Sequence, residues 1–401
     1  MSLVEQLHIT IQTLVDKYNP AILMDDEVND EINKKHEQNK TIDLHIHDYG
    51  MNGFVNNSNS CYMNSTLQCL LHTYDLIGFL TDKRIQRFIN PNKYESRLLV
   101  SFINMLYTYW KHSETVINPG EFKQLVGLFN TQFRNHHQQD SHELLNYLFD
   151  TFHECTKYEY PERKLDTYDE HYKTQLSQID TCTFDCDLEK LINVHYGFSV
   201  INNIFAINEL QELRCNSCKH LSLQIVHSYS MILELIKPRQ IICRGKRTDV
   251  ITLYTCLNNY FSQCEMTDWK CNECGELGGV KIHRLINTPS NLVITLNRFV
   301  VDQLGHTHKN INIVAYPEYL DISPYIYIKH DNIEHRTLDN TQYRLNCVIC
   351  QTGSIHGGHY YAYVRHLNNE WYICNDTKTS KVNVQDVLKD DQNAYILFYA
   401  R

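Results

Sequence analysis

The chain has 401 residues, enough for one large domain or for two or three smaller ones with cores of their own. Hydrophobic residues make up 42% of it, and 14 glycines and 8 prolines are too few for a linker-rich or disordered chain. The formal net charge of −10 argues against nucleic acid as the main partner, because phosphate binding needs clustered Lys and Arg. An acidic balance suits a basic partner or simply a soluble surface.

We expect residues 1–50 to be an N-terminal extension made of a helix and a polar linker. Apolar residues recur at helical spacing over residues 3–17, and residues 25–43 are mostly charged or polar. The run His45-Ile46-His47-Asp48 holds metal-ligating residue types, but strand-like alternation explains it more simply. No signal peptide and no stretch of about 18 apolar residues is visible, so we expect a soluble protein without membrane contact. We expect cytoplasmic residence, and the sequence leaves nuclear residence open.

Helices are predicted first along the chain, and strands later. A polar turn from Gly53 to Ser60 leads into Cys61 and an amphipathic helix, and residues 96–152 show helical spacing throughout. After about residue 195, segments rich in β-branched and apolar residues alternate with turns, and residues 393–401 form a final buried strand. This order favours an α+β fold.

The 15 cysteines are an odd number, and several of them form C-x-x-C pairs. In a reducing compartment this pattern favours metal binding or catalysis over disulfides. Two pairs in polar turns have the spacing of a tetrahedral four-cysteine zinc site. These pairs are Cys215-x-x-Cys218 and Cys271-x-x-Cys274. Cys347-x-x-Cys350 lies in an apolar strand, so we interpret it as core packing.

Cys61 is the candidate nucleophile. It opens a predicted helix, where unpaired backbone N–H groups and the helix dipole favour a negatively charged sulfur. The thiolate is the reactive form of cysteine, so this placement suits nucleophilic catalysis. Position alone fits a small buried residue as well.

The segment around Cys61, GFVNNSNSCYMNSTLQ, resembles the cysteine box of the ubiquitin-specific protease family, the papain-like deubiquitinases. The resemblance implies that Cys61 is the nucleophile. It also implies that the amide of Asn56 stabilises the oxyanion, together with the backbone N–H of Cys61. The family usually has Leu-Gly after this Asn, whereas this chain has Asn57-Ser58, and Ser adopts glycine-like backbone conformations less readily.

A second segment, residues 343–364, is similar to the family's histidine box. The resemblance implies that His359, which follows Gly357-Gly358, is the general base, and that the two glycines let the loop approach the substrate closely. His356 is a rival base, but it precedes the glycines and matches no motif position.

The pair Asn375-Asp376 lies where the family has the residue that orients the imidazole. Asn375 can orient the ring by accepting from its N–H, and Asp376 can supply electrostatic support for the imidazolium. An Asn-Asp pair is also common in turns. The sequence leaves open which of the two dominates.

Between these boxes, the segment QQDSHELL is similar to the family's Gln-Gln-Asp box. The resemblance implies that Gln138 and Asp140 hydrogen-bond the C-terminal tail of ubiquitin, Asp140 by pairing with an arginine of that tail. Asp140 also fits the N-cap of a helix, with Glu143 three residues later, and both can hold. Residues 296–299 and 316–325 match structural segments of the family's core.

The resemblance covers residues 53–401 and implies a papain-like hand. We expect a helical thumb near residues 53–190, β-rich fingers near 191–290 that carry the zinc cysteines, and a palm from 291 to 401. The implied activity is thiol-dependent hydrolysis of the bond after the terminal glycine of ubiquitin, with ubiquitin and ubiquitinated proteins as partners and no cofactor for catalysis. The alternatives are a silent ubiquitin-binding scaffold and a protease for another ubiquitin-like modifier.

Overall fold

The structure is a computed structural model. It describes residues 50–82, 89–111, 115–157, 196–236, 242–243, 246–247, 251–301, 305–327, 341–354 and 357–401. The expected N-terminal extension, the rival base His356 and the segment in which the thumb was expected to end lie outside these residues.

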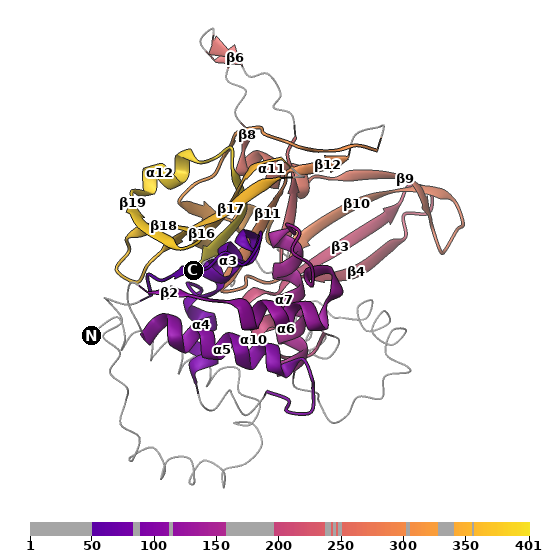
Figure 1. Cartoon of the computed structure of the whole chain (residues 1–401). Coiled ribbons are helices and arrows are strands. Elements are labelled where there is room, and N and C mark those ends of the chain that lie inside the picture. Colours follow the sequence, from indigo (N-terminus) through magenta and orange to yellow (C-terminus); the bar gives the residue numbers. More distant parts are fainter. Residues whose placement is uncertain are drawn as a thin grey trace, which may run out of the picture.

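Helices from the first half of the chain gather on one side of the molecule (Figure 1). They are α3 (Cys61–Leu70), α4 (Tyr74–Thr81), α5 (Ser96–Lys111), α6 (Gly120–Phe129), α7 (Ser141–Thr156) and α10 (Val200–Phe205). Residues 96–152 are largely helical as predicted, but a short strand, β2 (Val116–Ile117), and a 3-10 turn (Thr131–Phe133) interrupt them. Pro119, at the N-cap of α6, ends the irregular stretch because its ring fixes a helix-compatible φ.

A central sheet forms the body of the molecule beside these helices. Its strands follow the order β19-β18-β17-β16-β20-β11-β5, with β15 also paired to β16, and every pair except β11 with β5 is antiparallel. The strands are β5 (Met231–Glu234), β11 (Asn291–Asn297), β15 (Tyr319–Asp321), β16 (Gln342–Gly353), β17 (Gly358–Arg365), β18 (Trp371–Asn375), β19 (Lys378–Val382) and β20 (Ala394–Ala400). The predicted last strand is therefore in the middle of the sheet.

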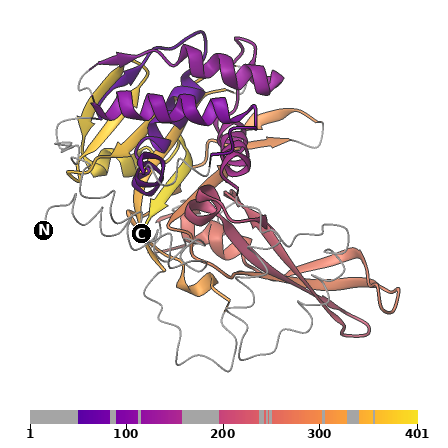
Figure 2. The same cartoon turned by 90° about the horizontal axis from the view of Figure 1, so that it is seen from below.

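A second, four-stranded sheet extends away from the body (Figure 2). Its antiparallel strands follow the order β4-β3-β10-β9. They are β3 (Ile207–Cys215), β4 (Leu221–Ser228), β9 (Cys264–Lys270) and β10 (Leu277–Leu285). Helices on one side and sheets built from the second half of the chain confirm the α+β class.

The segment that precedes Cys61 is held in place by a short parallel strand pair. Strand β1 (Gly53–Phe54) pairs with β2, and the N–H of Phe54 donates to the carbonyl of Asp376 at 2.7 Å. A Cβ on Gly53 would lie 2.4 Å from the carbonyl oxygen of Thr377, so only glycine allows this approach. The remaining short pairs are β6 (Ile242–Cys243) with β7 (Lys246–Arg247), β8 (Ile251–Thr252) with β14 (Val314–Ala315), and β12 (Phe299–Val301) with β13 (Thr307–Lys309).

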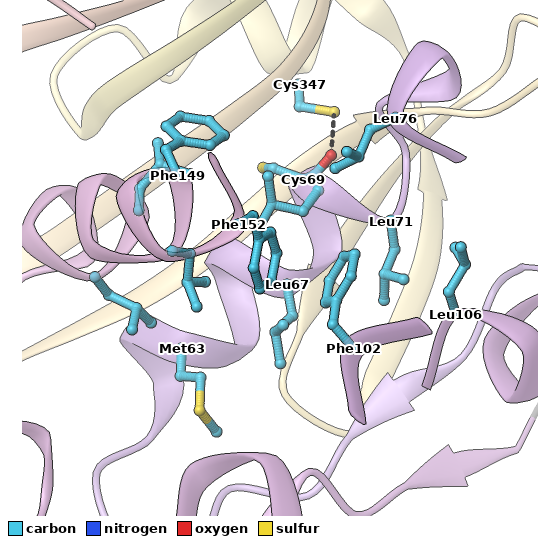
Figure 3. Close-up of a cluster of buried hydrophobic side chains, with 14 of the residues drawn as sticks. Met63, Leu67, Cys69, Leu71, Leu76, Phe102, Leu106, Phe149, Phe152 and Cys347 are labelled. Atoms are coloured by element: carbon cyan, nitrogen blue, oxygen red, sulfur yellow. Dashed lines mark hydrogen bonds between the residues drawn. The ribbon is translucent and has the colours of Figure 1, made fainter. Parts of the chain in front are cut away.

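The central sheet has a hydrophobic core on each face. One core lies between the sheet and the helices, and Figure 3 shows part of it, with Leu67 of α3 near Phe102 and Phe152. The other includes α11 (Leu253–Tyr260) and α12 (Val384–Lys389). Every residue of α3 is buried, so this helix is enclosed on all sides rather than amphipathic. Cys347 and Cys350 are both fully buried, which confirms that they are core residues.

Arg298 is the largest fully buried side chain among the described residues. Its guanidinium donates to four backbone carbonyls and so joins residues 310–312 and 391–394 to the end of β11. The acceptors are Ala394 at 2.5 Å, Asp391 at 2.7 Å, Asn312 at 2.9 Å and Asn310 at 3.1 Å. Among the helices described, none combines the length and the apolar character that a membrane span needs.

Candidate active site

Cys61 is the first residue of α3 and is 3% exposed. Burial raises the pKa of its thiol above the usual range. The backbone N–H of Tyr360 opposes that rise, while the negative charge of Asp376 adds to it. The thiol therefore needs a base to reach its reactive form at neutral pH.

The loop before Cys61 has a left-handed backbone at two successive residues. Ser58 has φ 59° and Asn59 has φ 56°, so the position where the family has glycine does adopt a glycine-like conformation. Lys123 of α6, which is 9% exposed, supports the loop by donating to the carbonyl of Asn57 at 2.7 Å and to that of Ser58 at 3.2 Å. Sequence reasoning missed Lys123, since nothing in its local pattern links it to residues 65 positions earlier.

Asn56 is held at both ends of its side-chain amide. Its Oδ1 accepts from the N–H of Ser60 at 2.9 Å, and its Nδ2 donates to Oδ2 of Asp376 at 2.9 Å. Because Ser60 immediately precedes Cys61, the oxygen of the amide is tied to the start of α3. Its nitrogen retains a second N–H for another acceptor.

His359 lies near the start of β17 and Asn375 at the end of β18. The ring Nε2 of His359 lies 2.7 Å from Oδ1 of Asn375. An amide oxygen only accepts, so Nε2 carries a proton and Nδ1 of the neutral ring has the free lone pair. This arrangement leaves Nδ1 able to take a proton.

The structure brings the two boxes together. Helix α3 packs against β17, and the backbone N–H of Tyr360, the residue after His359, acts on the sulfur of Cys61. Gln138 bridges the same two elements, with its Nε2 4.0 Å from Sγ of Cys61 and 2.8 Å from the carbonyl oxygen of Gly358. Residues nearly 300 positions apart thus meet at one point.

Asp376 faces the loop before Cys61. Its Oδ1 accepts from Nδ2 of Asn64 at 2.8 Å and its Oδ2 accepts from Asn56, while its backbone has φ 49°. No hydrogen bond joins Asp376 to His359 in the part of the chain that the structure describes. Asn64 was missed by sequence reasoning, although its place one helical turn after Cys61 could have pointed to it.

The Gln-Gln-Asp segment lies beside the same centre. Asp140 is the N-cap of α7 as predicted, with Oδ1 accepting from the N–H groups of His142 at 2.6 Å and Glu143 at 3.3 Å. Its Oδ2 accepts from the hydroxyl of Tyr395 at 2.8 Å. Burial raises the pKa of the Asp140 carboxyl, and these hydrogen bonds counteract the rise.

The two glycines before His359 differ in their surroundings. A Cβ on Gly357 would meet nothing within 4 Å, so its backbone faces open space. A Cβ on Gly358 would lie 2.2 Å from Nε2 of Gln351 and 2.5 Å from the carbonyl oxygen of Thr352. Gly358 is therefore required by packing within the hairpin, and Gly357 is the glycine that is open to a ligand.

Four cysteine sulfurs converge at the far end of the four-stranded sheet and lie within 4.8 Å of one another. The cysteines are Cys215, Cys218, Cys271 and Cys274. The sulfurs of Cys215 and Cys274 are 3.7 Å apart and those of Cys218 and Cys271 are 3.6 Å apart. A disulfide needs about 2.05 Å, whereas tetrahedral thiolates around zinc at about 2.3 Å lie about 3.8 Å apart.

The two cysteine turns have the same backbone design. In each, the N–H of the first cysteine donates at 2.9 Å to the carbonyl five residues later, from Cys215 to His220 and from Cys271 to Glu276. The residue before each acceptor is left-handed, with φ 62° at Lys219 and 74° at Gly275. The four thiols and their spacing fit a tetrahedral metal site.

Residues 52–399 match the family described as ubiquitin carboxyl-terminal hydrolase. Ubiquitin carboxyl-terminal hydrolase 4 of Saccharomyces cerevisiae is 29% identical over 388 residues, which cover 88% of this chain and 40% of that protein. The chain thus spans well under half the length of this relative. Probable ubiquitin carboxyl-terminal hydrolase R319 of Acanthamoeba polyphaga mimivirus is 27% identical over 444 residues, covering 88% of this chain and 90% of that protein.

Among solved structures, the SAGA Ubp8/Sgf11/Sus1/Sgf73 DUB module bound to ubiquitin aldehyde has a similar fold. The TM-score is 0.65 at 18% identity, over 94% of this chain and 76% of that one. The family match, which extends over most of the chain, agrees with the placement of the cysteine and histidine boxes. The chain therefore belongs to the ubiquitin carboxyl-terminal hydrolase family.

Proposed function

We propose that this chain is a thiol-dependent deubiquitinase that hydrolyses the peptide or isopeptide bond after the terminal glycine of ubiquitin. The observation that carries the proposal is the contact between the start of α3 and the start of β17. There, Cys61 lies against the strand that bears His359, and Asn375 fixes the tautomer of the ring. The similar DUB module is bound to ubiquitin aldehyde, which supports ubiquitin as the modifier.

In the proposed reaction, Nδ1 of His359 takes the proton of the Cys61 thiol, and the thiolate attacks the carbonyl carbon of the scissile bond. The second N–H of Asn56 and the backbone N–H of Cys61 donate to the oxyanion that forms. The imidazolium then protonates the leaving amine, which departs and leaves a thioester. His359 activates water to hydrolyse the thioester, which frees the ubiquitin carboxylate and restores the thiol.

We assign different partners to the two candidates for the third residue. Asn375 orients the imidazole, because its Oδ1 is hydrogen-bonded to Nε2 of His359. Asp376 positions the oxyanion donor, because its carboxylate binds Asn56 and Asn64.

For the tail of ubiquitin we propose a groove lined by Gln138, Asp140, Gly357 and Gly358. Gly357 offers its open backbone to the tail. Asp140 already accepts two hydrogen bonds at Oδ1 and one at Oδ2, so Oδ2 retains one lone pair that can accept from an arginine of the tail.

A covalent probe tests the activity. Ubiquitin with a C-terminal thiol-reactive group is expected to label the intact chain and to fail with Cys61→Ala. Labelling only by a probe built on another ubiquitin-like modifier would indicate that this modifier is the substrate. Binding of ubiquitin without labelling would indicate a catalytically silent scaffold. Either result would contradict the proposal.

We also propose that the four-cysteine cluster holds a structural zinc ion. Two buried and two exposed cysteines, all at thiolate spacing, supply the sulfur set that zinc prefers. The ion would join the two turns at the end of the sheet, and such sites contribute on the order of 10 kcal/mol to folding.

Elemental analysis tests for zinc directly, and one equivalent per chain is expected. Cys218→Ser should reduce the zinc content and lower the melting temperature. Cys264→Ser is the matched control, because Cys264 is an exposed thiol in the same sheet outside the cluster. Equal zinc content in both variants would contradict the assignment.

A further inference from the structure

The side chain of Gln138 pairs with the backbone of Gly358 in both directions. Its Oε1 accepts from the N–H of Gly358 at 3.0 Å, and its Nε2 donates to the carbonyl oxygen of Gly358 at 2.8 Å. The carboxamide is therefore occupied by the protein itself. A role limited to contacting a substrate does not account for this two-way bond.

This pairing occurs where β17 has no neighbouring strand on the edge that faces away from β16. The ladder between β17 and β18 runs from Arg365 paired with Trp371 to Ala362 paired with Cys374, and it stops there. On its other edge, β17 pairs with β16 as far as Gly358. The first residues of β17, including His359, therefore have a strand on one edge only. The amide of Gln138 takes the place of a strand residue on the open edge.

The segment that carries Gln138 is firmly attached to the sheet. Asp140 binds the hydroxyl of Tyr395 on β20, and Nε2 of His142 lies 3.1 Å from the hydroxyl of Ser230, next to β5. Three side chains at every second residue thus link this segment to three parts of the central sheet. Gln138 belongs to this rigid connection, so its position is set before any ligand arrives.

We propose that Gln138 is a positioning residue, which holds the start of β17, the strand that bears His359, against the start of α3 before ubiquitin binds. The inference rests on the proposed function. The carbonyl that Gln138 binds belongs to the peptide group that leads directly into His359. Rotation of this peptide group would move the imidazole, and the bond to Nε2 of Gln138 opposes that rotation.

The contact has a chemical consequence at the nucleophile. Burial disfavours the thiolate of Cys61, so its reactivity at neutral pH depends on a correctly placed imidazole. Loss of the two hydrogen bonds at Gly358 should therefore reduce the reactivity of Cys61 even toward reagents that never touch the ubiquitin groove.

Alkylation of Cys61 by iodoacetamide across pH 5–10 tests this role, because the reagent is too small to need the groove. We expect Gln138→Leu to lower the alkylation rate near pH 6 about tenfold, the factor that two ordinary hydrogen bonds are worth. At alkaline pH, where the thiol ionises unaided, the rate should be unchanged. The profile should shift toward that of His359→Ala. In a His359→Ala background Gln138→Leu should slow alkylation no further, whereas a further loss would show that Gln138 acts directly on Sγ of Cys61, 4.0 Å from its Nε2, and would overturn the inference.

Gln139→Leu is the matched control. Gln139 is the next residue, and its Nε2 donates to Oδ1 of Asn135 at 3.1 Å, away from β17. Its alkylation profile should equal that of the unmodified chain. If Gln138→Leu fails to fold, Gln138→Met tests the same point, since it keeps an uncharged side chain of similar length and loses both hydrogen bonds at Gly358.

A wild-type alkylation profile in Gln138→Leu, with only a higher KM for a ubiquitin substrate, would make Gln138 a substrate contact alone and overturn the inference. Failure of the unmodified chain to react with any ubiquitin probe would instead refute the proposed function. The two failures are thus distinguished by different reagents.

Discussion

Replacing Asp376 by Asn separates two roles that a carboxylate at this position can have. Asn tolerates the left-handed φ of 49°, so the turn should keep its shape. The single side-chain oxygen of Asn can accept from Asn56 or from Asn64, whereas the carboxylate accepts from both, at 2.9 and 2.8 Å. A hydrogen bond to a charged group is worth about 1.5–3 kcal/mol.

The loss in turnover has an upper limit if Asp376 acts through Asn56. A single oxyanion donor typically contributes about 10²–10³ in kcat, or about 2.7–4 kcal/mol. We expect Asp376→Asn to lower kcat by about 10- to 100-fold, since it loosens the donor without removing it. Asn56→Ala should lower kcat by the full factor of about 10²–10³ that one oxyanion donor typically contributes. The double variant should be no slower than Asn56→Ala alone, because both changes remove the same interaction.

Two assays check this prediction. Steady-state hydrolysis of a fluorogenic ubiquitin substrate gives kcat for the three variants, and alkylation of Cys61 reports on the thiol alone. The charge of Asp376 raises the pKa of that thiol, so Asp376→Asn should lower the pKa and leave alkylation at neutral pH unchanged or faster. Two results would show that Asp376 acts on the imidazole and would refute the reasoning. One is a double variant whose loss in kcat is the product of the two single losses, and the other is alkylation slowed as much as in His359→Ala.

Three further predictions concern packing and pH. Gly358→Ala should lower both activity and the melting temperature, because its Cβ would lie 2.5 Å from the backbone carbonyl oxygen of Thr352, which cannot move aside as a side chain can. Gly357→Ala should leave the melting temperature within a few degrees of that of the unmodified chain, as thermal denaturation would show. Arg298→Met should cost about 2 kcal/mol or more in urea unfolding, since it leaves four carbonyls without their donor, one of them, that of Ala394, in a buried residue; a loss under about 1 kcal/mol would contradict this. Burial lowers the pKa of His72 to about 3, so between about pH 3 and about pH 6.5 this residue is protonated in the unfolded state and neutral in the folded state. Stability is therefore complete above about pH 6.5 and should fall below it by up to about 1.4 kcal/mol per pH unit, a slope that should be shallower in His72→Gln.

Local patterns predicted the elements that carry the chemistry. Cys61 does begin a helix and Asp140 does cap one, as the local sequence around each predicted. These features depend on caps, turns and apolar spacing within a few residues, which a single sequence displays. The α+β class followed from the order of the same patterns.

Local patterns could not predict contacts between distant segments, and the pairing of the Cys61 and His359 segments was expected from the family resemblance alone. The carboxylate of Asp376 turned toward Asn56 and Asn64 rather than His359, and Gln138 was found bound to Gly358. Both depend on how strands and helices far apart in the chain are packed, and one rotamer decides which partner a short polar side chain meets. The ammonium group of Lys123 under the loop before Cys61 is a further case, since a lysine usually lies on the surface.

The turn after β18 holds two neighbouring residues that contact different parts of the candidate active site. In the proposed reaction, Asn375 contacts the base and Asp376 contacts the amide that donates to the oxyanion, while the backbone of the same turn is hydrogen-bonded to β1. A displacement of this hairpin would disturb proton transfer and charge stabilisation simultaneously, with neither able to compensate for the other. A force applied to β18 and β19 at a distance from Cys61 would therefore reduce turnover more than the loss of either contact alone.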